Sequence, residues 1–227
     1  MPQVSFHELY LRKQNICLHY CLVKPKNFSD KEKYPLFVYL HGFSDDIHSL
    51  VNRYLDLFTS QNYFIVFPQG VHEVLVDGRQ GYSWYRKNDE QYMMKDIKRD
   101  EDIVITLCDY LKRSLSVCRE HVVLGGFSQG AKLSHYIGLR HYSAFHSLIP
   151  VSGTYFDNEE HNLLSKACNL NVHLFHGTHD ELHPFEEAQS VYMQFVDAQV
   201  PVTFDSYDLG HYLNEEIVKK ILDRVEE

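Results

Sequence analysis

The sequence predicts an α/β fold in which a mostly parallel sheet of about eight strands lies between two layers of helices. Short apolar runs, typical of strands that are buried on both faces, alternate with longer segments whose apolar residues have helical spacing. The 227 residues suffice for one sizeable core, and no internal repeat or Pro/Ser-rich linker divides them. We therefore expect residues 1–227 to form a single three-layer α/β/α domain.

The strands are expected at eight apolar runs. The first two are joined by a polar turn at residues 12–15, which is typical of an opening hairpin. The predicted strands cover residues 6–11, 16–23, 36–40, 63–67, 122–124, 147–151, 172–175 and 202–207.

Helices are expected where apolar residues recur at helical spacing. These predicted helices cover residues 49–60, 99–115, 128–139, 161–168, 185–198 and 214–225. The apolar face of the last helix is either core or a contact in a homodimer. Residues 69–98 fit neither the helical nor the strand period, so we expect them to form a loop or small cap over a site.

Composition and charge exclude several classes of function. Acidic residues outnumber basic ones by 31 to 22, giving a net charge of -9, so nucleic acid is not expected as a partner. The amino terminus lacks a signal-peptide pattern, and no apolar run approaches the ~18 residues that span a bilayer. Five cysteines without paired metal-ligand spacing are typical of buried thiols. We expect a cytoplasmic protein.

A Gly-x-Ser-x-Gly pentad, Gly126-Phe-Ser-Gln-Gly130, stands between a predicted strand and a predicted helix. A nucleophilic serine on such a sharp turn needs small neighbours, because other segments must approach its strained backbone closely. Gly126 and Gly130 meet this need. The alternative is that Ser128 is an ordinary helix N-cap.

A serine hydroxyl becomes a good nucleophile only when a base takes its proton and a third group orients that base. Polar residues follow the ends of other predicted strands, where Asp180 and His211 supply the acid and the base. The chain order of Ser128, Asp180 and His211 is the order that the α/β-hydrolase fold produces. The other carboxylates that we consider in place of Asp180 are Glu181, Asp205 and Asp208.

Attack of a serine on a carbonyl creates an oxyanion that needs hydrogen-bond donors. The main-chain N–H of Gln129 follows the nucleophile, and that of Phe43 follows His41 and Gly42 at the end of another predicted strand. We expect these two groups to form the oxyanion hole. His41 itself is expected to orient the main chain rather than to act as a base.

Histidines cluster around Asp180, which raises the alternative of a metal site. The three histidines are His176, His179 and His183. They lack the fixed spacing with a carboxylate that metal sites use, so no metal and no cofactor is expected.

The sequence resembles the phospholipase/carboxylesterase family of α/β-hydrolases, which includes the acyl-protein thioesterases. The anchors of this resemblance run in order from about residue 36 to residue 216 and are highly specific as a set. They are Leu40-His-Gly-Phe43, Phe67-Pro-Gln-Gly70, Gly126-Phe-Ser-Gln-Gly130, Val151-Ser-Gly153, His176-Gly-Thr-His-Asp180 with Pro184, and Gly210-His211.

The resemblance implies a serine hydrolase that acts on carboxylic esters or thioesters, with Ser128, Asp180 and His211 as its triad. The opening hairpin and the aromatic segment around Trp84 differ from the thioesterases, and the hairpin is more similar to the feruloyl-esterase and polyhydroxybutyrate-depolymerase branches. We expect a carboxylesterase for short or medium acyl groups. A protein of the same fold that binds ligands without catalysis is the alternative from another class. Residues expected to contact the substrate, with core packing as their alternative, are Trp84, Tyr85, Leu182 and Phe185.

Overall fold

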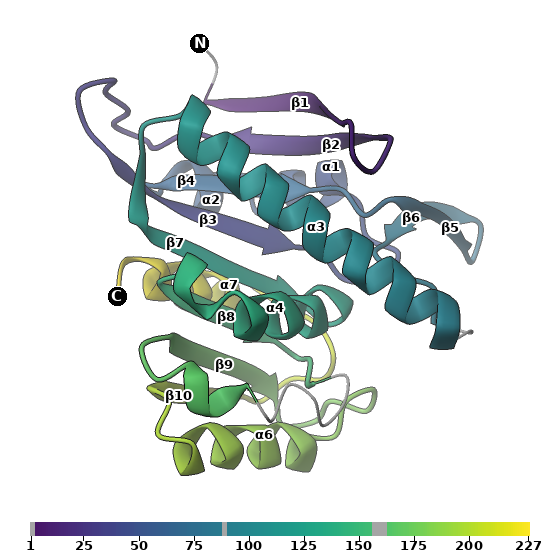
Figure 1. The fold of residues 1–227 in the computed structure, drawn as a ribbon. Coiled ribbons are helices and arrows are strands. Elements are labelled where there is room, and N and C mark those ends of the chain that lie inside the picture. The colour runs from purple at the N-terminus through teal and green to yellow at the C-terminus, as the bar shows by residue number, and fades with distance from the viewer. Residues whose placement is uncertain (1–2, 88–89, 156–162) are drawn as a thin grey trace. The chain divides into compact units, whose positions relative to one another are not determined.

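The structure of the protein is a computed structural model that describes residues 3–87, 90–155 and 163–227 (Figure 1). The chain divides into two compact units, residues 1–119 and residues 120–227, which are described in turn. Strands and helices alternate through both units, which confirms the predicted α/β class. The prediction that residues 1–227 form a single domain stays a prediction.

The first unit carries four strands of the larger sheet, in the order β1, β2, β4, β3, with bounds Val4–Leu11, Ile16–Val23, Phe64–Pro68 and Tyr34–Leu40. β1 and β2 are antiparallel and form the predicted hairpin, whose turn places Asn15 at a φ of 54°. Asparagine tolerates this left-handed backbone better than most residues. β4 runs antiparallel to β2 and parallel to β3, so the carboxyl ends of β3 and β4 lie at one edge of the sheet.

The predicted helix over residues 49–60 is wrong in its length, because the structure has two helices there, α1 (Ile47–Arg53) and α2 (Leu55–Thr59). Helix α1 begins early because the carboxylate of Asp46 accepts hydrogen bonds from the main-chain N–H of His48 and of Ser49, both at 2.9 Å. The break falls at Tyr54, whose φ of -128° and ψ of 28° are not helical. Tyr54 is nevertheless buried, so the apolar spacing continues through the break.

Residues 69–98, predicted to form a loop or small cap over a site, contain regular structure that the sequence periods did not indicate, and their place over a site stays a prediction. The segment contains a hairpin of β5 (His72–Val76) and β6 (Arg79–Ser83). Its two turn residues, Asp77 and Gly78, have φ values of 49° and 75°. An Asp-Gly pair with two positive φ values is the signature of a tight hairpin turn, so the sequence did contain this signal.

Helix α3 (Glu90–Ser114) begins nine residues before the predicted start at Arg99. Two positions that this helix buries carry carboxylates, Asp96 at 3% and Asp100 at 0% exposure. These carboxylates are paired with arginines, Asp96 with Arg86 and Arg99, and Asp100 with Arg99. Because charged residues replace apolar ones on its buried face, the helix has no apolar period at its beginning.

The second unit carries four parallel strands in the order β7, β8, β9, β10, of which β7 begins just before the division of the chain. The bounds are β7 Val117–Phe127, β8 Ser147–Val151, β9 Asn171–Gly177 and β10 Val202–Tyr207. With the four strands of the first unit they make the eight that the sequence predicts. Parallel order brings the carboxyl ends of β7 to β10 to one edge.

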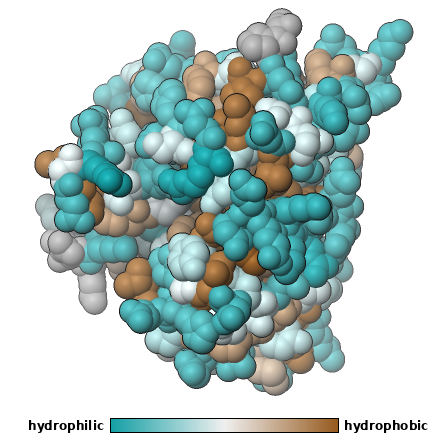
Figure 2. Space-filling model, turned by 180° about the vertical axis from the view of Figure 1, so that it is seen from behind, coloured by the Kyte–Doolittle hydropathy of each residue, from teal (hydrophilic) through white to brown (hydrophobic). Residues whose placement is uncertain are grey.

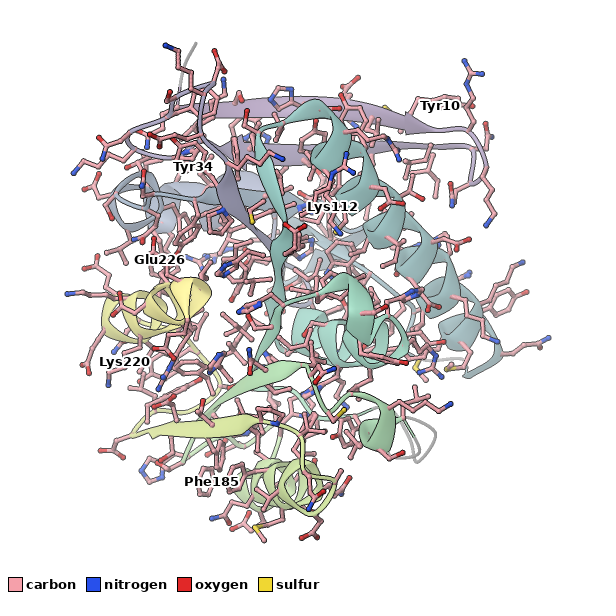
Figure 3. The ribbon with its side chains drawn as sticks, turned by 60° about the vertical axis from the view of Figure 1, so that its left-hand side comes forward. Tyr10, Tyr34, Lys112, Phe185, Lys220 and Glu226 are labelled. Atoms are coloured by element: carbon pink, nitrogen blue, oxygen red, sulfur yellow. The ribbon has the colours of Figure 1, made fainter. Side chains whose placement is uncertain are left out.

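The α-helices in the described residues of this unit are α4 (Gln129–Arg140), α6 (Phe185–Asp197) and α7 (Glu215–Asp223). Helix α4 packs along β8 and α6 along β9 and β10, while α4 and α7 lie on opposite faces of the strands (Figures 1 and 3). Single helical turns cover Tyr142–Ala144, Leu164–Lys166 and Arg224–Glu226. The predicted helix over residues 161–168 begins outside the described residues, and its described part contains only the turn Leu164–Lys166.

The apolar face of α7 is core in this chain. Its residues are buried to 5% exposure or less, and these are Ile217, Val218, Ile221 and Leu222. This burial favours the core alternative over a dimer contact. Hydrophilic side chains predominate on the face in Figure 2, where hydrophobic ones form small separate patches. None of the helices in the described part of the chain is both long and apolar enough to cross a membrane.

His135 is a fully buried histidine on α4, packed against the rings of Tyr155 and Phe195. Neither of its ring nitrogens makes a hydrogen bond among the described residues. Burial lowers the pKa of His135 to about 3, against a smaller opposing effect of the main chain at Gly153. The folded protein therefore resists protonation of this ring.

We predict that His135→Leu reduces the loss of stability on acidification. In the unfolded chain His135 binds a proton below its ordinary pKa of about 6.5, whereas in the folded protein it stays neutral until the pH is near 3. The free energy of unfolding therefore falls as pH decreases between these two values. Between pH 7.5 and pH 5.0 this contribution is about 2 kcal/mol. Urea unfolding at both pH values measures it.

The exposed His7, replaced by glutamine, is the matched control for this measurement. A decline in unfolding free energy that is equal in His135→Leu and the original protein would contradict the prediction.

Candidate active site

Three predicted residues follow the carboxyl ends of parallel strands in the second unit. Ser128 comes directly after β7, Asp180 three residues after β9, and His211 four residues after β10. Because these strand ends lie at one edge, the three loops can bring their side chains together.

Ser128 has a φ of 54° and a ψ of -109°, in a region that residues with side chains rarely occupy. Its N–H donates to the carbonyl of Val151 at 2.9 Å, and its own carbonyl accepts from Lys132 at 3.1 Å. A Cβ on Gly153 would lie 2.7 Å from the Ser128 carbonyl oxygen, so this glycine permits the close approach. The sharp turn is therefore held by main-chain hydrogen bonds and close packing.

The Ser128 side chain makes no capping hydrogen bond to α4, although the residue occupies the N-cap position. Gly126 and Gly130, which flank it in the pentad, are both buried. This geometry is that of a strand-to-helix elbow and argues against the N-cap alternative.

A continuous chain of hydrogen bonds joins the three side chains. Ser128 Oγ lies 2.8 Å from His211 Nε2, and His211 Nδ1 lies 2.7 Å from Asp180 Oδ2. An ionised carboxylate only accepts hydrogen bonds, so Nδ1 of the neutral imidazole carries the proton and donates it to Asp180. Nε2 is then the acceptor for the serine hydroxyl, as a general base must be.

Asp180 is buried, and its carboxylate is fully hydrogen-bonded on both oxygens. Its Oδ1 accepts from the N–H of Leu182 at 3.0 Å and of His183 at 2.9 Å. Burial alone would raise the pKa of Asp180, but the hydrogen bonds from His211, His183 and Leu182 outweigh it and hold the pKa below its ordinary value. Asp180 therefore stays ionised at neutral pH.

The other carboxylates lie in different surroundings. Asp205 is paired with Arg224 at 2.9 Å, and Asp208 is paired with His179 at 2.7 Å on the surface. Glu181 is exposed. No hydrogen bond or ion pair of these three among the described residues reaches His211.

The loop that carries His211 is packed against the end of β9. A Cβ on Gly177 would lie 2.4 Å from the Leu209 carbonyl oxygen. Main-chain hydrogen bonds from Thr178 to Tyr207 and from His179 to Leu209 fasten the two loops together. Only glycine allows this approach, which brings Asp180 and His211 within reach of each other.

Two of the three clustered histidines belong to this site, and sequence reasoning did not assign them a role. His176 Nε2 donates to the His183 carbonyl at 2.8 Å and lies 3.5 Å from Asp180 Oδ2. Burial, with the positive charge of Lys132 as the next cause, lowers the pKa of His183 to about 4. Its place three residues after Asp180 was the available signal. In the described ranges no group of three or more His, Cys, Asp or Glu is arranged to hold a metal ion.

Ser152 and Tyr207 were also missed. Their hydroxyls lie 3.0 Å apart and both residues are buried. Ser152 has a φ of 50°, and its N–H donates to the carbonyl of Phe175. It follows β8 as Ser128 follows β7, so a second strained serine lies at the same edge of the sheet.

The two predicted oxyanion donors belong to different units and are described separately. Gln129 is buried and begins α4, where main-chain N–H groups are available at the helix N-terminus. Phe43 follows β3 in the first unit, and its N–H has no acceptor among the described residues. His41 hydrogen-bonds main chain: its Nε2 accepts from Gly70 N–H at 2.9 Å, and its Nδ1 lies 2.7 Å from the Gly42 carbonyl oxygen.

The residues expected to contact substrate differ in exposure. Trp84 and Tyr85 are buried at 0% and 3%, which favours packing over stacking on a ligand. Phe185 begins α6 (Figure 3) and stacks on Phe204, with ring centroids 5.5 Å apart. Leu182, next to the turn that binds Asp180, is 69% exposed. Of the four, Leu182 alone presents a largely free side chain.

A groove of about 760 Å³ opens in the first unit. Its lining mixes apolar residues of β2 with polar ones that include Gln69, His72 and Arg99. None of the sequence-predicted site residues of the first unit lines this groove.

Comparisons with known proteins give a family and a fold. Residues 27–227 match the model of the phospholipase/carboxylesterase family. A search of curated proteins finds no significant match.

Solved structures of esterases are similar to this chain. A ferulic acid esterase from Anaeromyces mucronatus, solved in complex with ferulic acid, is 15% identical with a TM-score of 0.74, covering 97% of this chain and 89% of its own. The Zea mays acyl-protein thioesterase 2 is 18% identical with a TM-score of 0.68, covering 91% and 97%. The Bacillus cereus carboxylesterase is 16% identical with a TM-score of 0.71, covering 94% and 96%.

At these identities the likeness concerns the fold, which confirms the predicted α/β-hydrolase architecture. The family match spans most of the chain and includes every anchor that the sequence resemblance used. The chain therefore belongs to the phospholipase/carboxylesterase family and is an ester hydrolase of the α/β-hydrolase fold.

Proposed function

We propose that this protein hydrolyses carboxylic esters of short to medium acyl groups through a triad of Ser128, His211 and Asp180. The observation that carries the proposal is the hydrogen-bond chain from Ser128 Oγ through His211 to Asp180, with distances of 2.8 and 2.7 Å. The nucleophile, the base and the orienting carboxylate are thus arranged for acyl transfer.

In the proposed reaction His211 Nε2 accepts the Ser128 proton while Oγ attacks the ester carbonyl. The imidazolium formed in this step is stabilised by the Asp180 carboxylate, whose lowered pKa keeps it ionised. His211 then protonates the leaving alcohol, and an acyl group remains on Ser128. A water molecule that gives its proton to His211 attacks this acyl-enzyme and regenerates the serine.

The oxyanion of each tetrahedral intermediate needs donors, and we propose the N–H groups of Gln129 and Phe43. The position of Gln129 at the beginning of α4 supports the first assignment. The Phe43 N–H, which lacks an acceptor among the described residues, supports the second. Removal of one such donor typically lowers kcat by about 10²- to 10³-fold.

Two related substrate classes are alternatives. A feruloyl-type aryl ester is favoured by the opening β1–β2 hairpin and by the fold likeness to a structure that holds ferulic acid. Acyl-protein or lysophospholipid substrates are favoured by the fold likeness to an acyl-protein thioesterase. A non-catalytic binding role is disfavoured, because the three side chains are aligned for chemistry.

The proposed reaction needs only the protein, the ester and water. No cofactor is assigned a role in the reaction, and neither nucleic acid nor a transmembrane segment is part of it. A cytoplasmic location and a homodimer stay predictions that cell fractionation and sedimentation would test.

We predict that a fluorophosphonate probe labels Ser128 alone and that Ser128→Ala abolishes both labelling and ester hydrolysis. The probe reacts only with a serine whose proton is taken by a base. Peptide mass spectrometry locates the adduct. The exposed Ser190, replaced by alanine, is the matched control and should keep both properties. Labelling elsewhere, or activity in Ser128→Ala, would refute the assignment.

We predict that Asp180→Asn lowers kcat by about 10³- to 10⁴-fold, because an amide lets the imidazole adopt the wrong tautomer. Asp208→Asn removes an exposed carboxylate from the neighbouring loop and should leave kcat within twofold of the original. Steady-state kinetics on p-nitrophenyl butyrate compare them. Equal kcat values for the two variants would exclude Asp180 as the orienting group.

We predict that kcat/KM is highest for p-nitrophenyl esters of about two to eight carbons. The comparison set contains longer p-nitrophenyl esters, acyl-thioesters of matched chain length and methyl ferulate. An optimum for long-chain thioesters would favour the thioesterase alternative, and an optimum for methyl ferulate the aryl-esterase alternative. The rate of Ser128→Ala is subtracted from the rate on every substrate. A different optimum would therefore change the proposed substrate class but not the proposed triad.

A further inference from the structure

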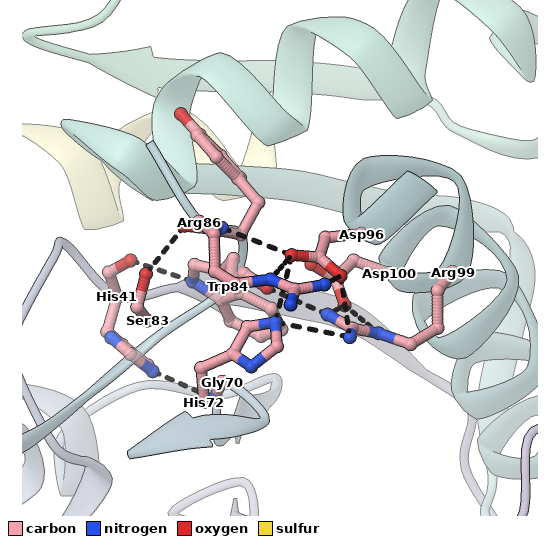
Figure 4. A network of polar contacts seen from close by, with 10 residues as sticks. His41, Gly70, His72, Ser83, Trp84, Arg86, Asp96, Arg99 and Asp100 are labelled. Carbon is pink, nitrogen blue, oxygen red and sulfur yellow. Dashed lines mark hydrogen bonds and ion pairs between the residues drawn. The ribbon is translucent and has the colours of Figure 1, made fainter. Parts of the chain in front are cut away.

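We infer that Trp84 and His41 clamp the two consecutive peptide units from His41 to Phe43, Trp84 the first and the His41 imidazole the second, which makes Trp84 a positioning residue for ester hydrolysis. The inference rests on the proposed function, in which the Phe43 N–H is an oxyanion donor. All the contacts that carry it lie within the first unit and are drawn in part in Figure 4.

The first step is the tautomer of His41, which is buried at 1% exposure. A main-chain N–H can only donate, so His41 Nε2 accepts from Gly70 N–H at 2.9 Å. The Gln69 amide is oriented by Ile47 N–H, which donates to its Oε1, so its Nε2 also faces His41 Nε2, at 3.0 Å. Nδ1 must therefore carry the proton and donate it to the Gly42 carbonyl oxygen at 2.7 Å.

The second step concerns the peptide unit that this hydrogen bond holds. In the described chain no peptide bond is cis, so the Gly42 carbonyl and the Phe43 N–H point in opposite directions. The carbonyl is held by His41 and also accepts from Asp45 N–H at 3.3 Å. Holding the carbonyl fixes the direction of the Phe43 N–H, which makes no hydrogen bond among the described residues.

The third step is the contact that holds His41. The indole Nε1–H of Trp84 donates to the His41 carbonyl at 2.9 Å, and the two rings lie 5.1 Å apart. This hydrogen bond fixes the peptide unit that precedes Gly42, as the imidazole fixes the one that follows it. Two consecutive peptide units are thus held by buried donors.

Trp84 is in turn held by charged groups of α3 (Figure 4). Arg99 Nη2 donates to the Trp84 carbonyl at 2.8 Å, and its other hydrogen bonds go to Asp96, Asp100 and His72. Asp96 binds the guanidinium of Arg86 with both oxygens, at 2.8 and 2.9 Å. The bound carbonyl and indole leave Trp84 little freedom to move.

The close approach of Gly70 supports the same arrangement. A Cβ there would lie 2.8 Å from the Ser83 carbonyl oxygen and 3.2 Å from His41 Nε2. Glycine at this position lets the segment next to Trp84 and the imidazole of His41 come together. His41 thus contacts Gly70 through its Nε2 and Trp84 through its carbonyl.

A test can remove the indole donor without changing its shape, because Trp84 is the one tryptophan in the sequence. When the protein is produced in a tryptophan auxotroph grown on 3-benzothienylalanine, sulfur replaces the indole N–H, and position 84 alone is changed. We expect kcat to fall about tenfold, less than loss of a whole donor, and KM to stay within twofold. Affinity for a trifluoromethyl ketone, whose adduct carries an oxyanion, should fall by the same factor as kcat.

Arg99→Lys provides a second variant that leaves Trp84 in place and removes the guanidinium N–H that binds its carbonyl. We expect the same split, a fall in kcat without a rise in KM. Tyr34→Phe is the matched control, because Tyr34, at the beginning of β3 (Figure 3), is a buried aromatic residue whose hydroxyl bonds only the segment of residues 27–32 in the contacts described. It should keep kcat and inhibitor affinity within twofold.

An unchanged kcat and unchanged ketone affinity in the benzothienylalanine protein and in Arg99→Lys would overturn the inference while Ser128→Ala remains inactive. A rise in KM with unchanged kcat would also overturn it, because that pattern indicates lost substrate binding rather than lost positioning. Activity in Ser128→Ala would instead overturn the proposed function, and the clamp with it.

Discussion

The hydrogen bond between Asp180 and His211 Nδ1 decides what the rest of the second unit can do chemically. It selects the tautomer in which Nε2 faces Ser128 as an acceptor. The bond depends on Asp180 being ionised, and against burial its pKa is held low by His211 itself and by the N–H groups of His183 and Leu182. The turn of residues 180–183 therefore supports the charge of the carboxylate that orients His211.

Charges are buried in the first unit too, but there they order a helix rather than a nucleophile. Burial raises the pKa of Asp100 well above its ordinary value, even though Arg99 opposes this. Hydrogen bonds from Arg86 and the charge of Arg99 outweigh burial at Asp96 and hold its pKa low. Asp96 lies between two arginines, and Arg99 also binds Asp100. These ion pairs let α3 bury two acidic side chains, and they give Arg99 a fixed direction toward the Trp84 carbonyl.

The elements of the fold differ in how well the sequence predicted them. Strands such as β8 and β10 were predicted to the residue, because apolar runs bounded by polar residues identify buried parallel strands. The beginning of α3 was missed, since Asp96 and Asp100 occupy positions where a periodic pattern needs apolar residues. The Asp77-Gly78 pair did indicate the turn of the β5–β6 hairpin, but it was not used in the prediction.

Residues of the candidate site divide in the same way. Ser128, Asp180 and His211 follow strand ends, so their meeting could be predicted from chain order and parallel topology. His176 contacts the main-chain carbonyl of His183, and His183 donates its main-chain N–H to Asp180, so side-chain types do not indicate these contacts and only the spacing of His183 from Asp180 was a signal. Trp84 was predicted to contact substrate, with core packing as the alternative, because aromatic residues serve both purposes. Only its burial and its hydrogen bond to His41 distinguish the two.

Two serines with strained backbone follow neighbouring strands of the second unit. Ser128 and Ser152 both have positive φ values, each at a cost of about 1–3 kcal/mol, directly after β7 and β8. Each N–H bonds the carbonyl of the next strand, from Ser128 to Val151 and from Ser152 to Phe175. The ladder between parallel strands thus continues one residue past each strand and holds the strained serine in place. Because the end of β8 accepts the Ser128 N–H and is itself held at Ser152 by β9, the position of Ser128, the proposed nucleophile, depends on the ordered ends of three strands.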